Sequence, residues 1–315
     1  MIHPRVVLIG AVESTRVAFE ALVAAKFALD LVITLPPERS GIHSDFVDLG
    51  PLARQHGIEM IATGNANSDE VVARVRAIAP DFIFVIGWSR LVGDALCGCA
   101  AKGVLGYHPA PLPQGRGRSA LAWTILLGMK ETAGSLFWID AGIDAGPIAA
   151  QASFTLPGRI DLPGLIDLHM RALRPMLDGL LPQLAAGAIP ALAQDESKAT
   201  WFAARRPEDG LIDWTQDAAG IDRLVRAVTR PYPGAFTFHA GKRMTIWRGE
   251  PVDVRGWHAQ AGQVFKIEEG ALFVRCGSEG CYRIDDYEIR NPDGELMPAL
   301  KGQPQLGLGW RKNDA

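Results

Sequence analysis

A histidine and an aspartate, each in a loop beside apolar runs, are the residues of this sequence best suited to acid–base chemistry. His108 ends the run GVLGYH, and Asp144 lies in the glycine-containing stretch DAGIDAGPIAAQ. A carboxylate beside an imidazole favours the protonated ring, and such a pair can move protons or stabilise developing negative charge. Each residue alone is typical of an ordinary loop, so the prediction rests on their combination.

The loop after His108 carries groups suited to an anionic ligand. Its sequence, PAPLPQGRGR, has three prolines that stiffen the backbone, and Arg116 and Arg118 flank a glycine. A guanidinium group is a planar fork of donors that matches a carboxylate or a phosphate. The loop therefore predicts a contact with a group of this kind.

The segments that position these loops predict a mostly parallel, doubly wound α/β sheet. Short apolar runs alternate with helical patterns, and such alternation produces right-handed βαβ crossovers. A helix with Ser14 or Thr15 as its N-cap follows the first strand. The predicted strands span residues 5–10, 29–35, 81–87 and 103–108, and a further helix spans 68–80.

The fold class predicts where the ligand binds, because ligands of open α/β sheets lie beyond the carboxyl ends of the strands. His108 is at such an end, and Gly87 and Trp88 follow the preceding strand. The stretch GAVEST after the first strand is neither a dinucleotide-binding glycine pattern nor a phosphate-binding loop. The sequence therefore lacks, after its first strand, the motif that would best support a nicotinamide or ATP site.

The chain changes character after residue 205. One helical pattern at 216–229 precedes short apolar runs separated by glycines, which is typical of a small antiparallel barrel. We predict a catalytic domain at residues 1–205 and a barrel domain at residues 206–315.

The composition argues against several classes of function. The 315 residues are 48% hydrophobic and 21% charged, with a net charge of −3 and an isoelectric point near 6.2. Such a chain has no overall attraction to nucleic acid or anionic membrane, although a local basic patch stays open. The four cysteines fit neither a zinc ribbon nor a disulfide framework, so we expect no metal. We find no leader-like start and no run of about 18 apolar residues, and we expect a cytoplasmic protein.

The sequence around His108 and Asp144 resembles the transferases that use 10-formyltetrahydrofolate to formylate an amine. This family has Asn-x-His, then a leucine- and proline-containing loop ending in Arg-Gly, then an Asp in a D-x-G loop. The matching stretches are GYH, PAPLPQGRGR and GIDAGPI, and PEDGLIDW and RAVTRPYPGAFT are similar to the family's inter-domain and barrel-opening segments. The resemblance implies a Rossmann-like core, an OB-like C-terminal barrel and a ternary complex without a covalent enzyme intermediate.

The resemblance also implies a role for each site residue. A primary amine attacks the formyl carbon, His108 stabilises the oxyanion or handles protons, and Asp144 orients His108 and helps to remove the amine proton. The co-substrate 10-formyltetrahydrofolate would dock through backbone groups, with Trp88 either covering a ring or belonging to the core. The implied folate contacts are Ile86, Gly87, Trp88, Arg90, Asp140, Gly142 and Ile143.

The chain departs from the family at Gly106, which stands where the family has its asparagine. That side chain normally donates to the formyl oxygen, and losing such a donor costs about 100- to 1,000-fold in rate. Tyr107 faces the other side of the predicted strand, whereas Ser119 or an ordered water could reach the site. Either another group replaces the donor or the activity is altered.

Several amines are compatible with the resemblance. The stretch RGRSALAW resembles the R-G-R-x-x-x-x-W of enzymes that formylate nucleotide-linked amino sugars, which implies substrate contacts from Arg116, Arg118 and Ser119. In those enzymes the second arginine lies near the sugar nucleotide, so Arg118 would hold the diphosphate or sugar side. Methionyl-tRNA is disfavoured by the acidic isoelectric point and by the few basic residues near 195–206. A small amine such as a hydroxyornithine side chain stays open, as does a homodimer.

Two functions of another class stay open because the asparagine is missing. A formyltetrahydrofolate hydrolase would release tetrahydrofolate without any amine. A folate-binding module would bind the folate without turnover.

Overall fold

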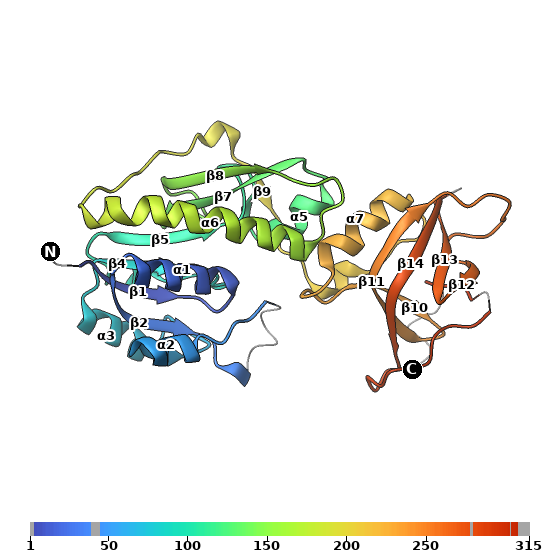
Figure 1. The fold of residues 1–315 in the computed structure, drawn as a ribbon, viewed down its shortest axis with the longest axis horizontal. Coiled ribbons are helices and arrows are strands. Elements are labelled where there is room, and N and C mark those ends of the chain that lie inside the picture. Colours follow the sequence, from blue (N-terminus) through green and yellow to red (C-terminus); the bar gives the residue numbers. More distant parts are fainter. Residues whose placement is uncertain (1–2, 39–44, 278–279, 303, 308–315) are drawn as a thin grey trace. The chain divides into compact units, whose positions relative to one another are not determined.

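The computed structural model describes residues 3–38, 45–277, 280–302 and 304–307, and its chain forms two compact units (Figure 1). The first unit comprises residues 1–120, 130–156 and 165–203, and the second comprises residues 121–129, 157–164 and 204–315. The main division lies between residues 203 and 204, and two short segments from earlier in the chain join the second unit. One of them is held there by Arg159, which donates to the buried Asp222 at 2.7 Å.

The first unit is built on a seven-stranded sheet in the order β3-β2-β1-β4-β5-β7-β8. The strands from β3 to β5 are parallel, whereas β7 and β8 are antiparallel to their neighbours. The predicted mostly parallel, doubly wound sheet is confirmed. The strands are β1 (Arg5–Ile9), β2 (Ala28–Thr34), β3 (Glu59–Ala62), β4 (Phe82–Val85), β5 (Gly103–His108), β7 (Glu131–Trp138) and β8 (Ile148–Thr155).

The strand order reverses at β1, which lies between β2 and β4. Such a switch point is where open α/β sheets form a ligand crevice. At this point the backbones after β1 and β4 approach closely: a Cβ on Gly10 would lie 1.9 Å from the Ile86 carbonyl oxygen. The Ala11 N–H also donates to the Gly87 carbonyl at 3.1 Å. Glycine at position 10 is therefore required by the packing of two strand ends.

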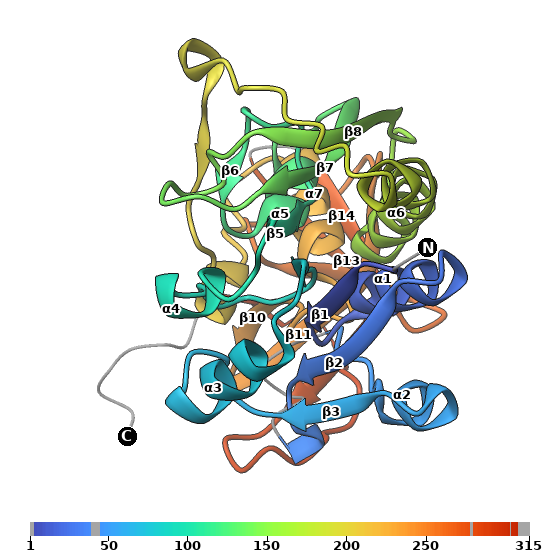
Figure 2. The ribbon, with the colours of Figure 1, turned by 90° about the vertical axis from the view of Figure 1, so that its left-hand side faces the viewer.

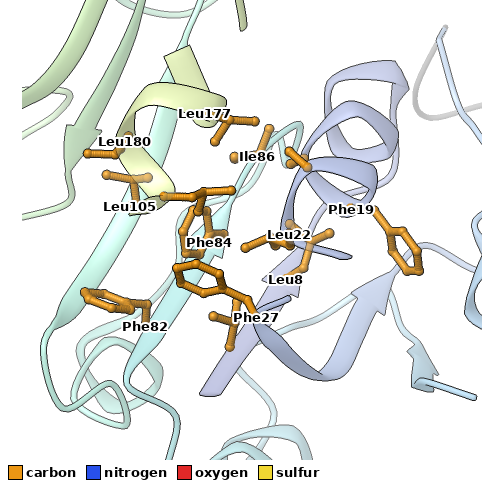
Figure 3. Packing of buried hydrophobic residues seen from close by; sticks show 14 of the residues in the cluster. Leu8, Phe19, Leu22, Phe27, Phe82, Phe84, Ile86, Leu105, Leu177 and Leu180 are labelled. Carbon is orange, nitrogen blue, oxygen red and sulfur yellow. The ribbon is translucent and has the colours of Figure 1, made fainter. Parts of the chain in front are cut away.

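Alternate residues of the central strands pack into two apolar layers. Leu8 and Phe84 join the layer that includes α1 (Glu13–Ala24) and α6 (Leu162–Ala185). Val7 and Ile83 join the layer that includes α3 (Asp69–Ile78) and α4 (Asp94–Cys97). Figure 2 shows these helix pairs on opposite faces of the sheet, and Figure 3 shows the first layer with Leu177 of α6. Because helices cover both faces of the sheet, polar side chains can gather at the carboxyl ends of its strands.

The first helix begins earlier than the sequence predicted. It starts at Glu13, so neither Ser14 nor Thr15 is its N-cap, and that prediction is wrong. The Thr15 hydroxyl instead accepts from the Val12 N–H at 3.1 Å and donates to the Ile86 carbonyl at 2.7 Å. The remaining α-helices of the described chain are α2 (Gly50–His56), α5 (Ala120–Leu126) and α7 (Ala218–Val228). None of the helices in the described ranges is both long and apolar enough to cross a bilayer.

The second unit contains an antiparallel sheet in the order β10-β11-β14-β13-β12. The predicted antiparallel strands are confirmed, whereas the OB-like barrel is not, because this order has two ends among the residues that the structure describes. The β12 edge of this sheet pairs with residues near the C-terminus. The Val264 N–H donates to the Pro304 carbonyl, and Gln263 forms an antiparallel bridge with Gln305. The strands are β10 (Ala235–His239), β11 (Lys242–Val252), β12 (Val264–Glu268), β13 (Ala271–Cys276) and β14 (Gly280–Arg290).

Candidate active site

His108 lies at the carboxyl end of β5 with its imidazole almost fully buried. Its Nε2 atom is 2.7 Å from the carbonyl oxygen of Gly115, and because a carbonyl only accepts, Nε2 carries the hydrogen. The other ring nitrogen, Nδ1, lies 3.7 Å from Oδ2 of Asp144. That distance is too long for a hydrogen bond but short enough for an ion pair. Nδ1 is therefore the ring atom that can gain or lose a proton, and it faces a carboxylate.

The loop between β7 and β8 holds Asp144 in a constrained conformation. Its φ angle is +51°, in the left-handed region that residues other than glycine rarely adopt. Its Oδ2 accepts the Gly117 N–H at 2.8 Å. Two residues on, a Cβ on Gly146 would lie 1.8 Å from the Trp138 carbonyl oxygen, so only glycine fits there. The backbone and this hydrogen bond together aim the carboxylate at His108.

The arginine loop, residues 115–118, is fixed by a short parallel pairing. In it, β6 (Arg116–Gly117) pairs with β9 (Trp201–Phe202). Gly117 has a φ angle of +101°, and a Cβ on it would lie 2.5 Å from the Phe202 carbonyl oxygen. A side chain at this position would displace the backbone that donates to Asp144.

The two arginines of this loop have different surroundings. Arg116 is 2% exposed, and its guanidinium donates to Gln194 at 2.8 and 3.1 Å and to Glu196 at 2.6 and 2.9 Å. The hydrogen bond to Glu196 raises the pKa of Arg116 above its usual value. Arg118 is exposed, with Nη2 3.4 Å from the Ser89 carbonyl oxygen. Of the two arginines, Arg118 is thus the one that presents its side chain to solvent.

Gly106 lies two residues before His108 on β5, and the ring of Phe137 covers it. A Cβ on Gly106 would lie 2.9 Å from Cε1 of Phe137 and 3.2 Å from Cγ1 of Ile139. The first distance is shorter than side chains tolerate, so the asparagine expected from the resemblance does not fit unless the ring moves. An aromatic ring fills the space that its side chain would occupy.

Comparison of the sequence with known protein families gives two matches along the chain. Residues 41–157 match the family described as "Formyl transferase", and residues 205–301 match "Formyl transferase, C-terminal domain". The chain belongs to the formyl transferase family. The two matches together span about two thirds of this formyltransferase.

Solved structures with a similar fold cover between 79% and 95% of this chain. HypX from Aquifex aeolicus, in complex with tetrahydrofolic acid, has a TM-score of 0.65 at 18% identity and covers 95% of the chain. The match covers 46% of HypX, so the chain spans about half the length of that protein. An N-formyltransferase from Helicobacter canadensis has a TM-score of 0.63 at 15% identity, covering 90% of this chain and 99% of the other. A methionyl-tRNA formyltransferase from Clostridium thermocellum has a TM-score of 0.58 at 21% identity, covering 79% and 93%.

The predicted folate contacts after β4 differ in exposure. The Ile86 side chain is buried in the core, and its carbonyl accepts the Thr15 hydroxyl. Trp88 is half-buried against the layer with α3 and α4, whereas Arg90 is exposed and donates to the Gly64 carbonyl. Trp88 and Arg90 can therefore contact a ligand through their side chains, whereas the side chain of Ile86 lies in the core.

The predicted contacts after β7 lie on an exposed turn. The Asp140 carboxylate accepts the Gly142 N–H at 2.9 Å, and Ile143 is 61% exposed. Besides Asp144, two of the predicted site residues have positive φ angles. These are Gly87, at +76°, and Ser119, at +60°. Within the described ranges, no three His, Cys, Asp or Glu side chains gather as a metal site.

The sequence did not reveal the residues that support the two loops. Gln194 and Glu196, which hold Arg116, lie in the polar stretch AQDESKAT, and no spacing in the sequence links them to the site. Ser135 is fully buried in β7 and donates to the Ala110 carbonyl at 2.7 Å. Gln151 of β8 donates to the Ser135 hydroxyl at 2.9 Å. β7 is buried along nearly its whole length, so no alternation in its sequence distinguishes Ser135 or its partners.

A second histidine lies on the other side of the sheet from His108. The Tyr107 hydroxyl and Nδ1 of His169 are 2.9 Å apart, and His169 is 1% exposed. Burial, with a smaller contribution from the charge of His108, lowers the pKa of His169 to about 3. His169 is therefore neutral at physiological pH, and it packs edge-on against Phe154.

Proposed function

We propose that this formyltransferase moves the formyl group of 10-formyltetrahydrofolate to a primary amine on a nucleotide-linked sugar. The observation that carries the proposal is the pairing of Nδ1 of His108 with the Asp144 carboxylate at the carboxyl edge of the sheet, in a chain of the formyl transferase family. These are the two residues for which the resemblance implies acid–base roles, and such a pair is suited to moving protons to and from a reacting nitrogen.

The residues around the site are compatible with a folate co-substrate. The exposed turn with Asp140 and Ile143 offers a carboxylate acceptor and an apolar side chain, and the half-buried Trp88 offers part of a ring face. HypX from Aquifex aeolicus was solved with tetrahydrofolic acid, and the Helicobacter canadensis enzyme with folinic acid. These structures and side chains support a reduced folate as the formyl donor.

The reaction needs one proton removed from the amine and one delivered to the leaving nitrogen. The amine nitrogen attacks the formyl carbon, and its proton passes to the His108–Asp144 pair. The bond from the formyl carbon to N10 of the folate then breaks, and N10 leaves with a proton from the same pair. In between, the positive charge of the protonated His108 ring stabilises the negative oxygen, since Gly106 has no side-chain amide to do so.

A sugar nucleotide is favoured over tRNA by the length of the matches and by charge. The Helicobacter canadensis enzyme was solved with dTDP-3-aminofucose, and WlaRD, a sugar 3N-formyl transferase solved with dTDP, covers 95% of this chain and 100% of its own. The methionyl-tRNA formyltransferase covers 79% of the chain. The net charge of −3 also disfavours a long polyanion, and the exposed Arg118 suits a single diphosphate.

The test is formyl transfer with defined acceptors. The enzyme is incubated with 10-formyltetrahydrofolate and a panel of nucleotide-linked amino sugars, and tetrahydrofolate release and the mass of one added formyl group are followed. The matched controls are the same sugar nucleotides with a hydroxyl in place of the amine. Formylation of one amino sugar and of no hydroxyl sugar is expected. Transfer to methionyl-tRNA alone, release of tetrahydrofolate without any amine, or folate binding without turnover would each overturn the proposal.

A further inference from the structure

Gln194 joins the arginine loop to the loop that carries Asp144. Its Nε2 donates to the carbonyl oxygens of Asp144 and Gly146, at 2.8 and 2.7 Å. Its Oε1 accepts from Nε and Nη2 of Arg116, at 3.1 and 2.8 Å. We infer that Gln194 is a positioning residue, which holds the Asp144 carboxylate at His108 for the transfer reaction. This inference rests on the proposed function.

The charge of Arg116 fixes which way the Gln194 amide points. A guanidinium group has donors only, so it must face the amide oxygen, and the NH₂ group must then face the two carbonyls. With the amide reversed, its NH₂ would meet the guanidinium donors and its oxygen would meet two carbonyl oxygens. Arg116 in turn is 2% exposed and is held by the carboxylate of Glu196. The buried arginine therefore orients the amide and does not need to touch a substrate.

The Asp144 loop needs such support because of its backbone. The φ angle of Asp144, +51°, lies in the left-handed region, which is less favourable than the right-handed region for a residue with a side chain. Gln194 binds the carbonyls of Asp144 and Gly146, so one side chain fixes the chain on both sides of Ala145. The Gly117 N–H donates to Oδ2 of Asp144 and so holds the side chain of the same residue. With the carbonyl and carboxylate both anchored, the 3.7 Å approach to His108 is fixed by protein groups alone.

Replacing Gln194 separates this role from simple packing. Gln194→Glu keeps the shape and the acceptor for Arg116 but loses both donors to the loop, and Gln194→Ala loses all of these bonds. The matched control is Gln183→Glu, because Gln183 is an exposed glutamine that donates one hydrogen bond to the Gly179 carbonyl on α6. We expect kcat to fall about 10- to 100-fold in both Gln194 variants, because a misplacement of about 1 Å can cost that much. KM for both substrates should stay within about twofold.

Amide hydrogen exchange gives a second measurement that does not depend on turnover. Peptides covering residues 140–147 should exchange faster in Gln194→Glu than in the wild type, while peptides of β1 and β4 stay unchanged. Gln183→Glu should match the wild type in both experiments. An unchanged kcat, or unchanged exchange at 140–147, would overturn the positioning role. If the wild type formylates no amine, the proposed function fails, and the exchange experiment still decides whether Gln194 holds the loop.

Discussion

Nδ1 of His108 lies 3.7 Å from Oδ2 of Asp144, although β6, α5 and β7 separate the two residues along the chain. Because β7 runs antiparallel to β5 and ends beside Leu105, the loop after β7 has to fold back toward His108, where the Gly117 N–H holds the Asp144 carboxylate. The site is therefore assembled by contacts between loops that are distant in the chain. It does not come from one contiguous motif.

We expect His108→Ala and Asp144→Asn each to lower kcat for formyl transfer by at least about 100-fold. Asparagine at 144 can still accept the Gly117 N–H but has no charge. The fall in kcat of this variant therefore isolates the contribution of the carboxylate charge. His258→Ala, at an exposed histidine of the second unit, is the control. Steady-state kinetics with a saturating acceptor measure the effect, and wild-type rates in either variant would refute the acid–base assignment.

Gly106→Ala should destabilise the fold by about 1–3 kcal/mol, because the new methyl group would lie 2.9 Å from the Phe137 ring. Gly179→Ala is the control, since a Cβ there meets nothing within 4 Å and alanine favours a helix. Urea unfolding measures both. If the ring is the obstacle, Phe137→Leu should recover part of the loss in the double variant, and strictly additive effects would contradict the clash.

Gly106→Asn tests the altered position directly. Because the Phe137 ring fills the space beside Gly106, we expect this variant to be less stable than the wild type and no faster in formyl transfer. A rate increase at unchanged stability would show that the space beside Gly106 accepts the asparagine side chain.

Arg118→Ala should raise KM for the amine substrate about 10- to 100-fold and leave KM for the folate nearly unchanged, because a charge-assisted hydrogen bond is worth about 1.5–3 kcal/mol. Arg171→Ala, at an exposed arginine of α6 paired with Asp167, should change neither value. Arg116→Ala should act through the Asp144 loop and lower kcat instead. Equal effects of Arg118→Ala on both substrates would remove its phosphate role.

The buried His169 should make the fold sensitive to acid. Its folded-state pKa is lowered to about 3, whereas an unfolded histidine titrates near about 6.5. Below that pH the unfolded chain takes up a proton that the folded chain does not, so the free energy of unfolding falls as pH drops from about 6.5 toward 3 by up to about 1.4 kcal/mol per unit. Urea unfolding between pH 7 and pH 5 should show a shallower decline in His169→Leu. His258→Leu should keep the wild-type slope, and identical slopes in all three proteins would contradict the shift.

The sequence by itself determined the main strands of the sheet and the candidate acid–base pair. The apolar runs before Gly87 and at 103–108 predicted β4 and β5, because burial on both faces selects continuous hydrophobic residues in a parallel strand. Since the ligand edge of such a sheet follows from strand direction, His108 could be placed at the site from its position in the chain.

Only the tertiary structure decided what each polar group touches. Arg116 and Arg118 are alike in sequence, yet the pairing of β6 with β9 buries the first beside Gln194 and leaves the second exposed. The ring over Gly106 comes from β7 in the same way. Sequence periodicity reports contacts within a few residues, whereas these partners are set by which distant segments the sheet order brings side by side.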